Sequence, residues 1–350
     1  MKDSNKNKKE SSFLIKNIRL IKSQEIRLLV RLLFLVIILW TGYRFYGFVN
    51  YYQDHSVAAS VERPPGVEGF LPISSLMGLR YWIQSGDFNT IHPAGMVLFM
   101  LFLVIALFMK KGFCGWICPI GLLSEHLWKA GRKIFGRNFV FPRWVDFPLR
   151  SIKYLILLFF VYAVFAMSLD DLKAFLYGSY NKIADVKMLY FFTKMTSFTF
   201  WVLVALMVLS LFVKNFWCRY LCPYGALLGF LSVFSPLKVT RNPDSCTGCA
   251  DCTDACPANI QVHQKQRIRS DECMSCVACI EACPEPDTLK LRLNKKSKFS
   301  LPAWAYAAIV IGLFLLFTGV ARLTGHWQNS VSPTEYHQLI NDMDNADLQH

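Results

Sequence analysis

Five uninterrupted apolar runs constrain this fold more than any other feature of the sequence. They cover residues 32–49, 94–109, 152–169, 197–213 and 302–321. Each is close to the ~20 apolar residues that a helix needs to cross a bilayer, and none shows the periodic polar positions of a helix on a soluble core. In a chain that is 54% hydrophobic, the runs predict an all-α membrane helix bundle of about five transmembrane helices.

A sixth apolar stretch, Pro223 to Phe234, is too short to cross a membrane. It is expected to be re-entrant, to lie at the membrane interface or to pack against the bundle. The second and fourth runs are also short for a span, so they need help from flanking residues.

The net charge of +14 would suggest a nucleic-acid partner in a soluble protein, but its distribution has another explanation. The first 27 residues carry eight Lys or Arg, residues 110–153 carry nine and residues 214–298 carry twelve, whereas residues 50–93 and 170–196 carry only two and four. By the positive-inside rule the basic segments are cytoplasmic. The sequence therefore predicts a multi-pass protein of the bacterial inner membrane, with its N-terminus inside, its acidic C-terminal tail outside and no role in binding nucleic acid.

The N-terminal segment, residues 1–31, is predicted to be basic and cytoplasmic. Its second half and the start of the first apolar run, Phe13 to Leu32, mix apolar residues with Lys and Arg. This pattern is typical of a helix that lies on anionic lipid. A charged flank that only fixes the topology would give the same pattern.

All twelve cysteines lie in the segments predicted to be cytoplasmic. A reducing compartment disfavours disulfides and favours metal or redox chemistry. Eight of the cysteines form two runs, Cys246 to Cys256 and Cys273 to Cys283, each with the spacing C-x2-C-x2-C-x3-C-P. This spacing is typical of bacterial ferredoxins with two clusters, in which the fourth Cys of each run binds the other cluster.

The spacing assigns four ligands to each of two [4Fe–4S] clusters. Cluster 1 is expected to be held by Cys246, Cys249, Cys252 and Cys283, and cluster 2 by Cys273, Cys276, Cys279 and Cys256. Zinc sites normally use paired cysteines with a longer gap, so structural zinc is disfavoured. The predicted organisation is a transmembrane bundle over residues 32–242, a small α+β ferredoxin-like module over 243–293, and a last transmembrane helix with an outer tail over 294–350.

The remaining four cysteines belong to an internal repeat. The segment from Leu107 to Leu123 aligns with the segment from Leu211 to Leu228, and through the cysteines the offset is 104 residues. In each copy an apolar run is followed by a Lys, an aromatic residue and C-x3-C-P. A parallel repeat of this kind is expected to follow a pseudo-two-fold axis along the membrane normal.

We call the four cysteines of the repeat the rim cysteines: Cys114, Cys118, Cys218 and Cys222. Cysteines four apart face the same way on a helix, and the proline after the second one predicts that the helix ends there. Four converging thiolates could bind an additional metal ion or cluster, act as a redox dithiol, or pack as small buried side chains. The sequence leaves these three alternatives open.

Together, these motifs resemble the NapH/YccM-type membrane polyferredoxins, which are related to the C-terminal region of NosR and to the core of CcoG (RdxA/FixG). The outer segments Arg63 to Trp82 and Ile91 to Gly95 are also similar to that family, and the resemblance covers about residues 30–320. It implies a membrane electron-transfer protein between the quinone pool and a redox partner protein, as in a component of a quinol dehydrogenase.

Two other functions stay open. A CcoG-like copper reductase would bind a soft ion at the rim cysteines, although the chain shows no C-terminal immunoglobulin-like domain. A redox sensor would use a cluster or the dithiol as its switch. The chain also shows no dinucleotide fingerprint or C-x-x-C-H haem motif, so any link to NADH requires a partner.

A quinol donor would need a proton-accepting group near its headgroup. Candidates at the predicted outer face are Glu68, Arg80 and His92. The pattern of their segment is also typical of ordinary anchoring at the membrane interface. Candidates at the inner face are Lys110, His126 and Lys214. The sequence does not choose between the two faces.

Overall fold

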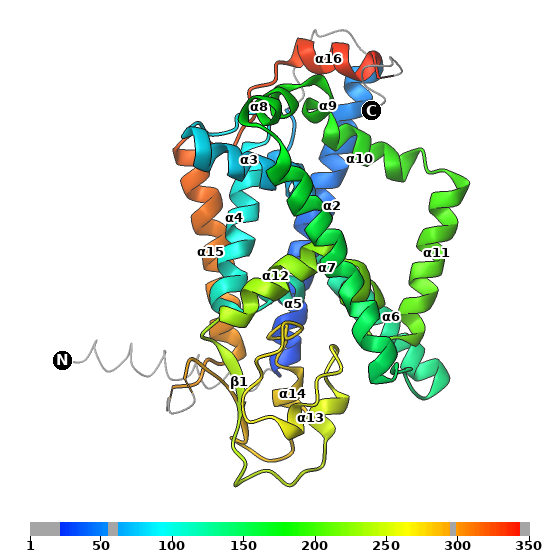
Figure 1. The fold of residues 1–350 in the computed structure, drawn as a ribbon, viewed down its shortest axis with the longest axis vertical. Coiled ribbons are helices and arrows are strands. Elements are labelled where there is room, and N and C mark those ends of the chain that lie inside the picture. Colours follow the sequence, from blue (N-terminus) through cyan, green and yellow to red (C-terminus); the bar gives the residue numbers. More distant parts are fainter. Residues whose placement is uncertain (1–21, 55–61, 295–298, 344–350) are drawn as a thin grey trace, which may run out of the picture.

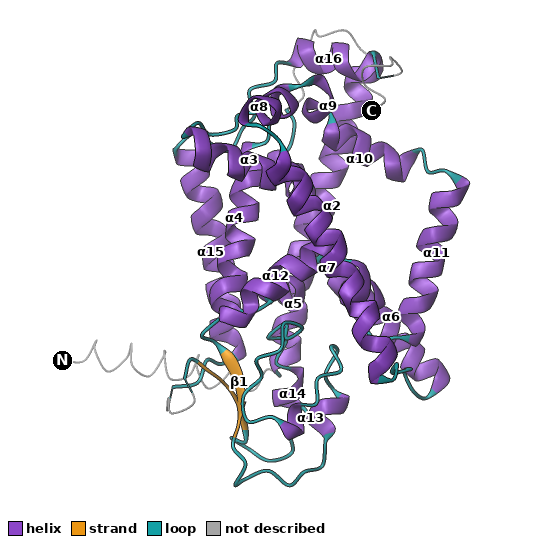
Figure 2. Ribbon diagram, viewed as in Figure 1, coloured by secondary structure: helices purple, strands orange, loops and turns teal. Residues whose placement is uncertain are grey.

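The computed structural model describes residues 22–54, 62–294 and 299–343. The described chain is an elongated helical bundle with a small module at one end (Figures 1 and 2). The module contains β1, α13 and α14, and helices α3, α8, α9 and α16 lie at the opposite end.

Helices cover all five of the predicted apolar runs. They are α2 (Ser23–Asp54), α4 (Pro93–Met109), α7 (Arg143–Ala166), α11 (Ser197–Phe212) and α15 (Ala303–Leu323). Within the described residues α2, α7 and α15 are each long and apolar enough to cross a membrane, which fits a membrane protein. Helix α4 has only 17 residues, and α11 qualifies only together with α10 (Ala184–Thr193), from which it is bent by 79°.

Shorter elements connect the long helices. At the end far from the module these are η1 (Pro65–Phe70), α3 (Pro72–Ser85), α8 (Leu169–Tyr177), α9 (Ser179–Lys182) and α16 (Pro333–Asn341). Next to the module they are α5 (Gly112–Trp116), α6 (Pro119–Phe135), η2 (Trp217–Leu221) and α12 (Pro223–Phe234).

The two copies of the repeat pack reciprocally. Helix α6, which follows the cysteines of the first copy, packs against α11 of the second copy, and α12 of the second copy packs against α4 of the first. Gly131 permits the first of these contacts, since an added Cβ would clash with the Leu211 carbonyl oxygen. The short stretch Pro223–Phe234 therefore packs against the bundle, which is one of the three places expected for it.

The module is built around a two-stranded antiparallel sheet. Strand β1 (Lys238–Arg241) pairs with β2 (Leu289–Arg292), with Lys238 opposite Arg292. Between them lie α13 (Asp251–Asp254), η3 (Val262–Gln264) and α14 (Ala278–Glu281). The sheet begins before residue 243, the predicted start of the module, because β1 closes the fold against β2.

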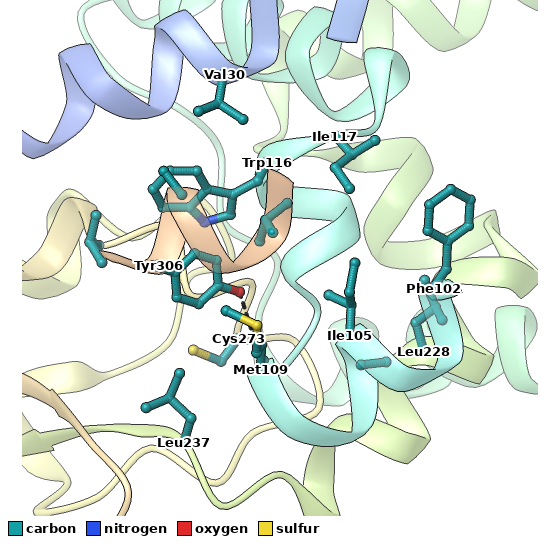
Figure 3. Packing of buried hydrophobic residues seen from close by; sticks show 14 of the residues in the cluster. Val30, Phe102, Ile105, Met109, Trp116, Ile117, Leu228, Leu237, Cys273 and Tyr306 are labelled. Atoms are coloured by element: carbon teal, nitrogen blue, oxygen red, sulfur yellow. Dashed lines mark hydrogen bonds between the residues drawn. The ribbon is translucent and has the colours of Figure 1, made fainter. Parts of the chain in front are cut away.

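One hydrophobic core joins the module to the bundle. Cys273 and Leu237 lie in the same cluster as Trp116 and Tyr306 (Figure 3). The Tyr306 hydroxyl donates a hydrogen bond to the Met109 carbonyl at 2.7 Å, and its ring stacks on Trp116. The module is thus packed onto the bundle rather than tethered to it.

The start of α2 differs from the expected interfacial helix. The described helix begins at Ser23, and Arg27 is buried and paired with Glu125 of α6. Residues 1–21, which include most of the predicted interfacial segment, lie outside the described residues. Arg27 faces protein because a buried carboxylate provides its counter-ion.

Candidate functional site

Two small cavities in the module are each lined by four cysteines. One is lined by Cys246, Cys249, Cys252 and Cys283, which we call the distal set. The other is lined by Cys256, Cys273, Cys276 and Cys279, which we call the bundle-side set. These are the two groups of four that the spacing predicts, and the binding of iron by them stays a prediction.

The backbone of both runs adopts the same unusual conformation. Gly248 and Ala250 have positive φ in the first run, and Ser275 and Val277 have positive φ at the equivalent places in the second. Left-handed backbone is costly for a β-branched residue such as Val277. These turns aim backbone N–H groups at sulfur: the Gly248 amide lowers the pKa of the Cys246 thiol. The loops therefore fit an anionic sulfur-bound group.

The two cysteine sets differ in exposure. Cys249 of the distal set is exposed, whereas all four cysteines of the bundle-side set are buried. The distal set thus reaches the surface of the module at Cys249, whereas the bundle-side set is enclosed.

The four rim cysteines line one apolar cavity of about 580 Å³. Cys114 lies in α5 and Cys218 in η2. Cys118 and Cys222 have extended backbone and precede the prolines that begin α6 and α12. The predicted helix end is therefore observed, but each pair spans that end rather than lying on one continuous α-helix.

The new helices place their first amides against the second cysteine of each pair. The Gly225 N–H donates to Cys222 Sγ at 3.2 Å, and the Gly121 amide does the same for Cys118. A helix N-terminus favours negative charge on such a sulfur. Cys118 and Cys222 thus lie in equivalent environments, one in each copy of the repeat.

Burial opposes ionisation of the rim thiols. It raises the pKa of Cys114 to about 12 and that of Cys118 to about 11. A reactive dithiol requires the opposite shift. Within the described chain, no group of three or more His, Cys, Asp or Glu side chains is arranged to hold a metal ion.

The rim cavity connects three parts of the molecule. Its walls include α2 at Phe34 and Thr41, α15 at Phe314, and η1 at the end far from the module. The module contributes Pro257, Ala258 and Met274, which adjoin ligands of the bundle-side set. The cavity therefore runs from module residues beside the bundle-side set to η1 at the far end of the bundle.

A buried charge cluster fastens the module beside this cavity. Lys111 Nζ lies 3.2 Å from Glu272 Oε2, and Lys153 also pairs with Glu272. Arg150 Nη2 lies 3.0 Å from Asp271 Oδ1.

Burial raises the pKa of Asp271, but the Tyr154 hydroxyl and Arg150 outweigh this and lower it to about 2. The acids directly before Cys273 thus anchor the second run to α5 and α7.

The inner-face candidates do not line the cavity. His126 is exposed, and the buried Lys110 and Lys214 donate to backbone carbonyls of the module. Two other residues line the cavity instead: Lys111, which follows Lys110 in the chain, and Tyr224. Sequence reasoning missed both, although each lies within the repeated motif.

The structure separates the outer-face candidates. Glu68 and His92 lie in one buried cluster, in which Arg63 Nη1 donates to Glu68 Oε1 at 2.6 Å and Arg63 Nη2 lies 2.5 Å from Asp185 Oδ2. Burial opposes ionisation of Glu68, but Arg63 and His92 hold its pKa below the usual value. Arg80 lies elsewhere and donates to the Met167 carbonyl. Glu68 is therefore a weak proton acceptor that anchors η1.

Family models match both parts of the chain. One, described as a 4Fe-4S binding domain, matches twice, over residues 91–138 and 195–242. Another, described as a 4Fe-4S dicluster domain, matches residues 238–284. The first model therefore covers each copy of the rim motif, and the second covers the paired cysteine runs.

Several curated proteins are similar to this chain. YccM of Escherichia coli (strain K12), named as an electron transport protein, is 41% identical over 89% of this chain and 88% of its own. The regulatory protein NosR of Pseudomonas aeruginosa is 32% identical over 53% of this chain and 25% of its own. The ferredoxin-type protein NapH of Haemophilus influenzae is 26% identical over 45% and 51%. No solved structure matches at a significant level.

Proposed function

The chain belongs to the family of YccM and its ferredoxin-type relatives, an electron-transport family with 4Fe-4S domains, and from this we propose that it relays electrons between the quinone pool and a redox partner protein. The apolar helices fit a membrane protein. In our proposal it lies in the bacterial inner membrane, with the module and the N-terminus in the cytoplasm, as the distribution of Lys and Arg predicts.

Two [4Fe–4S] clusters carry the electrons in this proposal, one bound by the distal set and one by the bundle-side set. The support is the grouping of four cysteines around each of two cavities, together with the matching left-handed turns of the two runs. The clusters would supply one-electron chemistry. The exposed Cys249 makes the distal set the place where a partner exchanges electrons.

We assign an additional iron–sulfur centre to the rim cysteines. A model described as a 4Fe-4S binding domain covers both pairs, and the raised thiol pKa values disfavour a reactive dithiol. The reciprocal packing of α6 on α11 and of α12 on α4 supports a pseudo-two-fold relation between the copies. Such a relation would let each copy supply two of the four sulfurs.

We assign the quinone to the rim cavity. Its mostly apolar walls suit a lipid-soluble ring and tail, and it is bordered by the transmembrane helices α2 and α15. Tyr224 and Lys111 provide polar groups beside the cysteines. A quinone there would lie next to the rim centre, which short-range electron transfer requires.

One observation carries the proposal: the rim cavity is lined both by all four rim cysteines and by module residues next to the bundle-side set. Its test is anaerobic quantification of iron and acid-labile sulfide, with EPR of the reduced protein, before and after Cys114→Ser and Cys218→Ser together. We expect more than about eight iron atoms per wild-type chain, and loss of only the excess in the double variant.

About eight iron atoms in both proteins would contradict the rim centre and leave the two ferredoxin clusters standing. Fewer than about eight in the wild type would contradict the cluster assignment itself. Oxidation of a quinol analogue by the wild type, and its loss in the double variant, tests the quinone site separately.

Copper reduction is the second function that the rim cysteines could serve. It requires a soft-ion site, which the sulfurs of the four rim cysteines could provide. Copper binding that depends on Cys114 and Cys218 would favour copper reduction over electron transfer with quinone.

A further inference from the structure

Each copy of the repeat places a buried lysine against the module. Lys110 and Lys214 are 104 positions apart, and both are buried at the end of an apolar helix. Lys110 Nζ donates to the Ser270 carbonyl at 3.1 Å. Lys214 Nζ donates to the Asp254 carbonyl at 2.7 Å and to the Cys256 carbonyl at 3.4 Å. Equivalent residues thus reach different parts of the module.

These two contacts flank the same cysteine set. Ser270 precedes Cys273 in the second run, and Cys256 ends the first run, yet both cysteines line the bundle-side cavity. The next residue of each copy makes a similar contact: the Lys111 amide donates to the Cys273 carbonyl at 3.4 Å, and Asn215 Nδ2 donates to the Pro257 carbonyl at 3.2 Å. The repeat therefore holds the bundle-side set from two sides.

Neither lysine has a carboxylate partner within the described part of the chain. The Nζ of Lys110 contacts only a carbonyl, and Asp271 nearby is engaged by Arg150 and Tyr154. Lys214 lies over the Trp128 ring at 5.1 Å. Burying an ammonium group without a counter-ion is strongly unfavourable. Lys110 and Lys214 are two such ammonium groups beside the bundle-side set. They indicate that their counter-ion is an anionic group bound by these cysteines.

We infer that Lys110 and Lys214 set the reduction potential of the bundle-side cluster, an inference that rests on the ligation proposed above. When that cluster accepts one electron, it becomes more negative by one charge. Nearby cations in a low-dielectric interior stabilise the reduced form. They therefore hold the potential of the bundle-side cluster above the value that it would have without the two lysines.

The test is an anaerobic redox titration of the full-length protein in detergent, followed by EPR. The variants are Lys110→Met, Lys214→Met and the double variant, which remove charge and keep the length of the side chain. The signal altered by Cys249→Ser identifies the distal cluster, and the signal lost when Cys114→Ser and Cys218→Ser are combined identifies the rim centre. We expect each Met variant to lower the midpoint potential of the bundle-side cluster, the double variant to lower it further, and the distal potential to stay constant.

Lys265→Met is the matched control, since Lys265 is exposed on the same module; it should move neither potential appreciably. Equal shifts of both clusters, or unchanged potentials with both signals present, would overturn the inference. Loss of the bundle-side signal together with half of the module's iron would make the lysines assembly residues and would also overturn it. A wild type without two cluster signals would instead defeat the proposed function.

Discussion

Glu125 is a single buried carboxylate that neutralises three cations. Arg27 and Arg31 of α2 each lie 2.6 Å from its Oε2, and Lys129 lies 2.7 Å from its Oε1. Arg27 also donates to the Gly115 carbonyl at 2.9 Å. This residue therefore joins α2 to the segment that carries the first pair of rim cysteines.

We expect Glu125→Gln to lower the free energy of unfolding by about 3–5 kcal/mol, because it leaves two buried guanidinium groups without a counter-ion. Thermal and denaturant unfolding in detergent would measure the loss. Lys129→Met is the control: the Lys129 side chain is 55% exposed, so its removal should cost about 1 kcal/mol or less. Similar losses in the two variants would contradict the role of Glu125.

The same carboxylate predicts a pH dependence. Burial opposes ionisation of Glu125, but Arg27 and Arg31 hold its pKa below the usual value. A carboxyl with a depressed folded pKa contributes its full stability above the unfolded value of about 4.3, and loses it as the pH falls further. The difference in stability between wild type and Glu125→Gln should be constant from about pH 7 to 5 and shrink below that range.

At the scale of elements, the short helix α5 is the contact between the bundle and the second cysteine run. An added Cβ at Gly115 would lie 2.5 Å from the Met274 carbonyl oxygen. The neighbouring Trp116 Nε1 donates to the Ser275 carbonyl at 3.0 Å. The run thus rests on the backbone of α5, and only a glycine permits this approach.

Gly115→Ala should push the second run away from α5 and cost about 1–3 kcal/mol by overpacking. The measurements are thermal unfolding and iron content of the purified protein, and we expect iron to be lost from the bundle-side set first. Gly42→Ala in α2 is the matched control, since no atom lies within 4 Å of the added Cβ. If Gly115→Ala and Gly42→Ala both keep the iron content and the stability of the wild type, the close contact at Gly115 is not needed to dock the second run on α5.

At the scale of the whole molecule, the module lies at one end of the bundle and α16 at the other (Figure 1). Long apolar helices run between the two ends. If these helices span the bilayer, the module and α16 face opposite compartments. The excess of Lys and Arg around the module then assigns it to the cytoplasm.

Reporter fusions in a bacterial host test this orientation. Alkaline phosphatase, which matures only outside the cytoplasm, should be active when fused after residue 350 and inactive when fused after residue 293. Green fluorescent protein at the same two positions should give the complementary pattern. A phosphatase active after residue 293 would invert the orientation and place the distal set on the outer side.

Features encoded by contiguous residues could be predicted. The apolar runs predicted where the helices lie, and the spacing of Cys246 to Cys283 predicted which cysteines meet, because hydropathy and motif spacing act over a few turns of chain. The boundary of the module at residue 243 differs from the structure, since β1 is recognised only through its pairing with β2.

The sequence by itself determined the class of the protein, its family, and the two groups of four cysteines in the module. Only the tertiary structure decided that the rim cysteines of both copies share one cavity, that Glu125 pairs with Arg27, and that Lys110 and Lys214 hold the module. These contacts join residues that are far apart in the chain. They depend on how helices pack, and no local pattern encodes that packing.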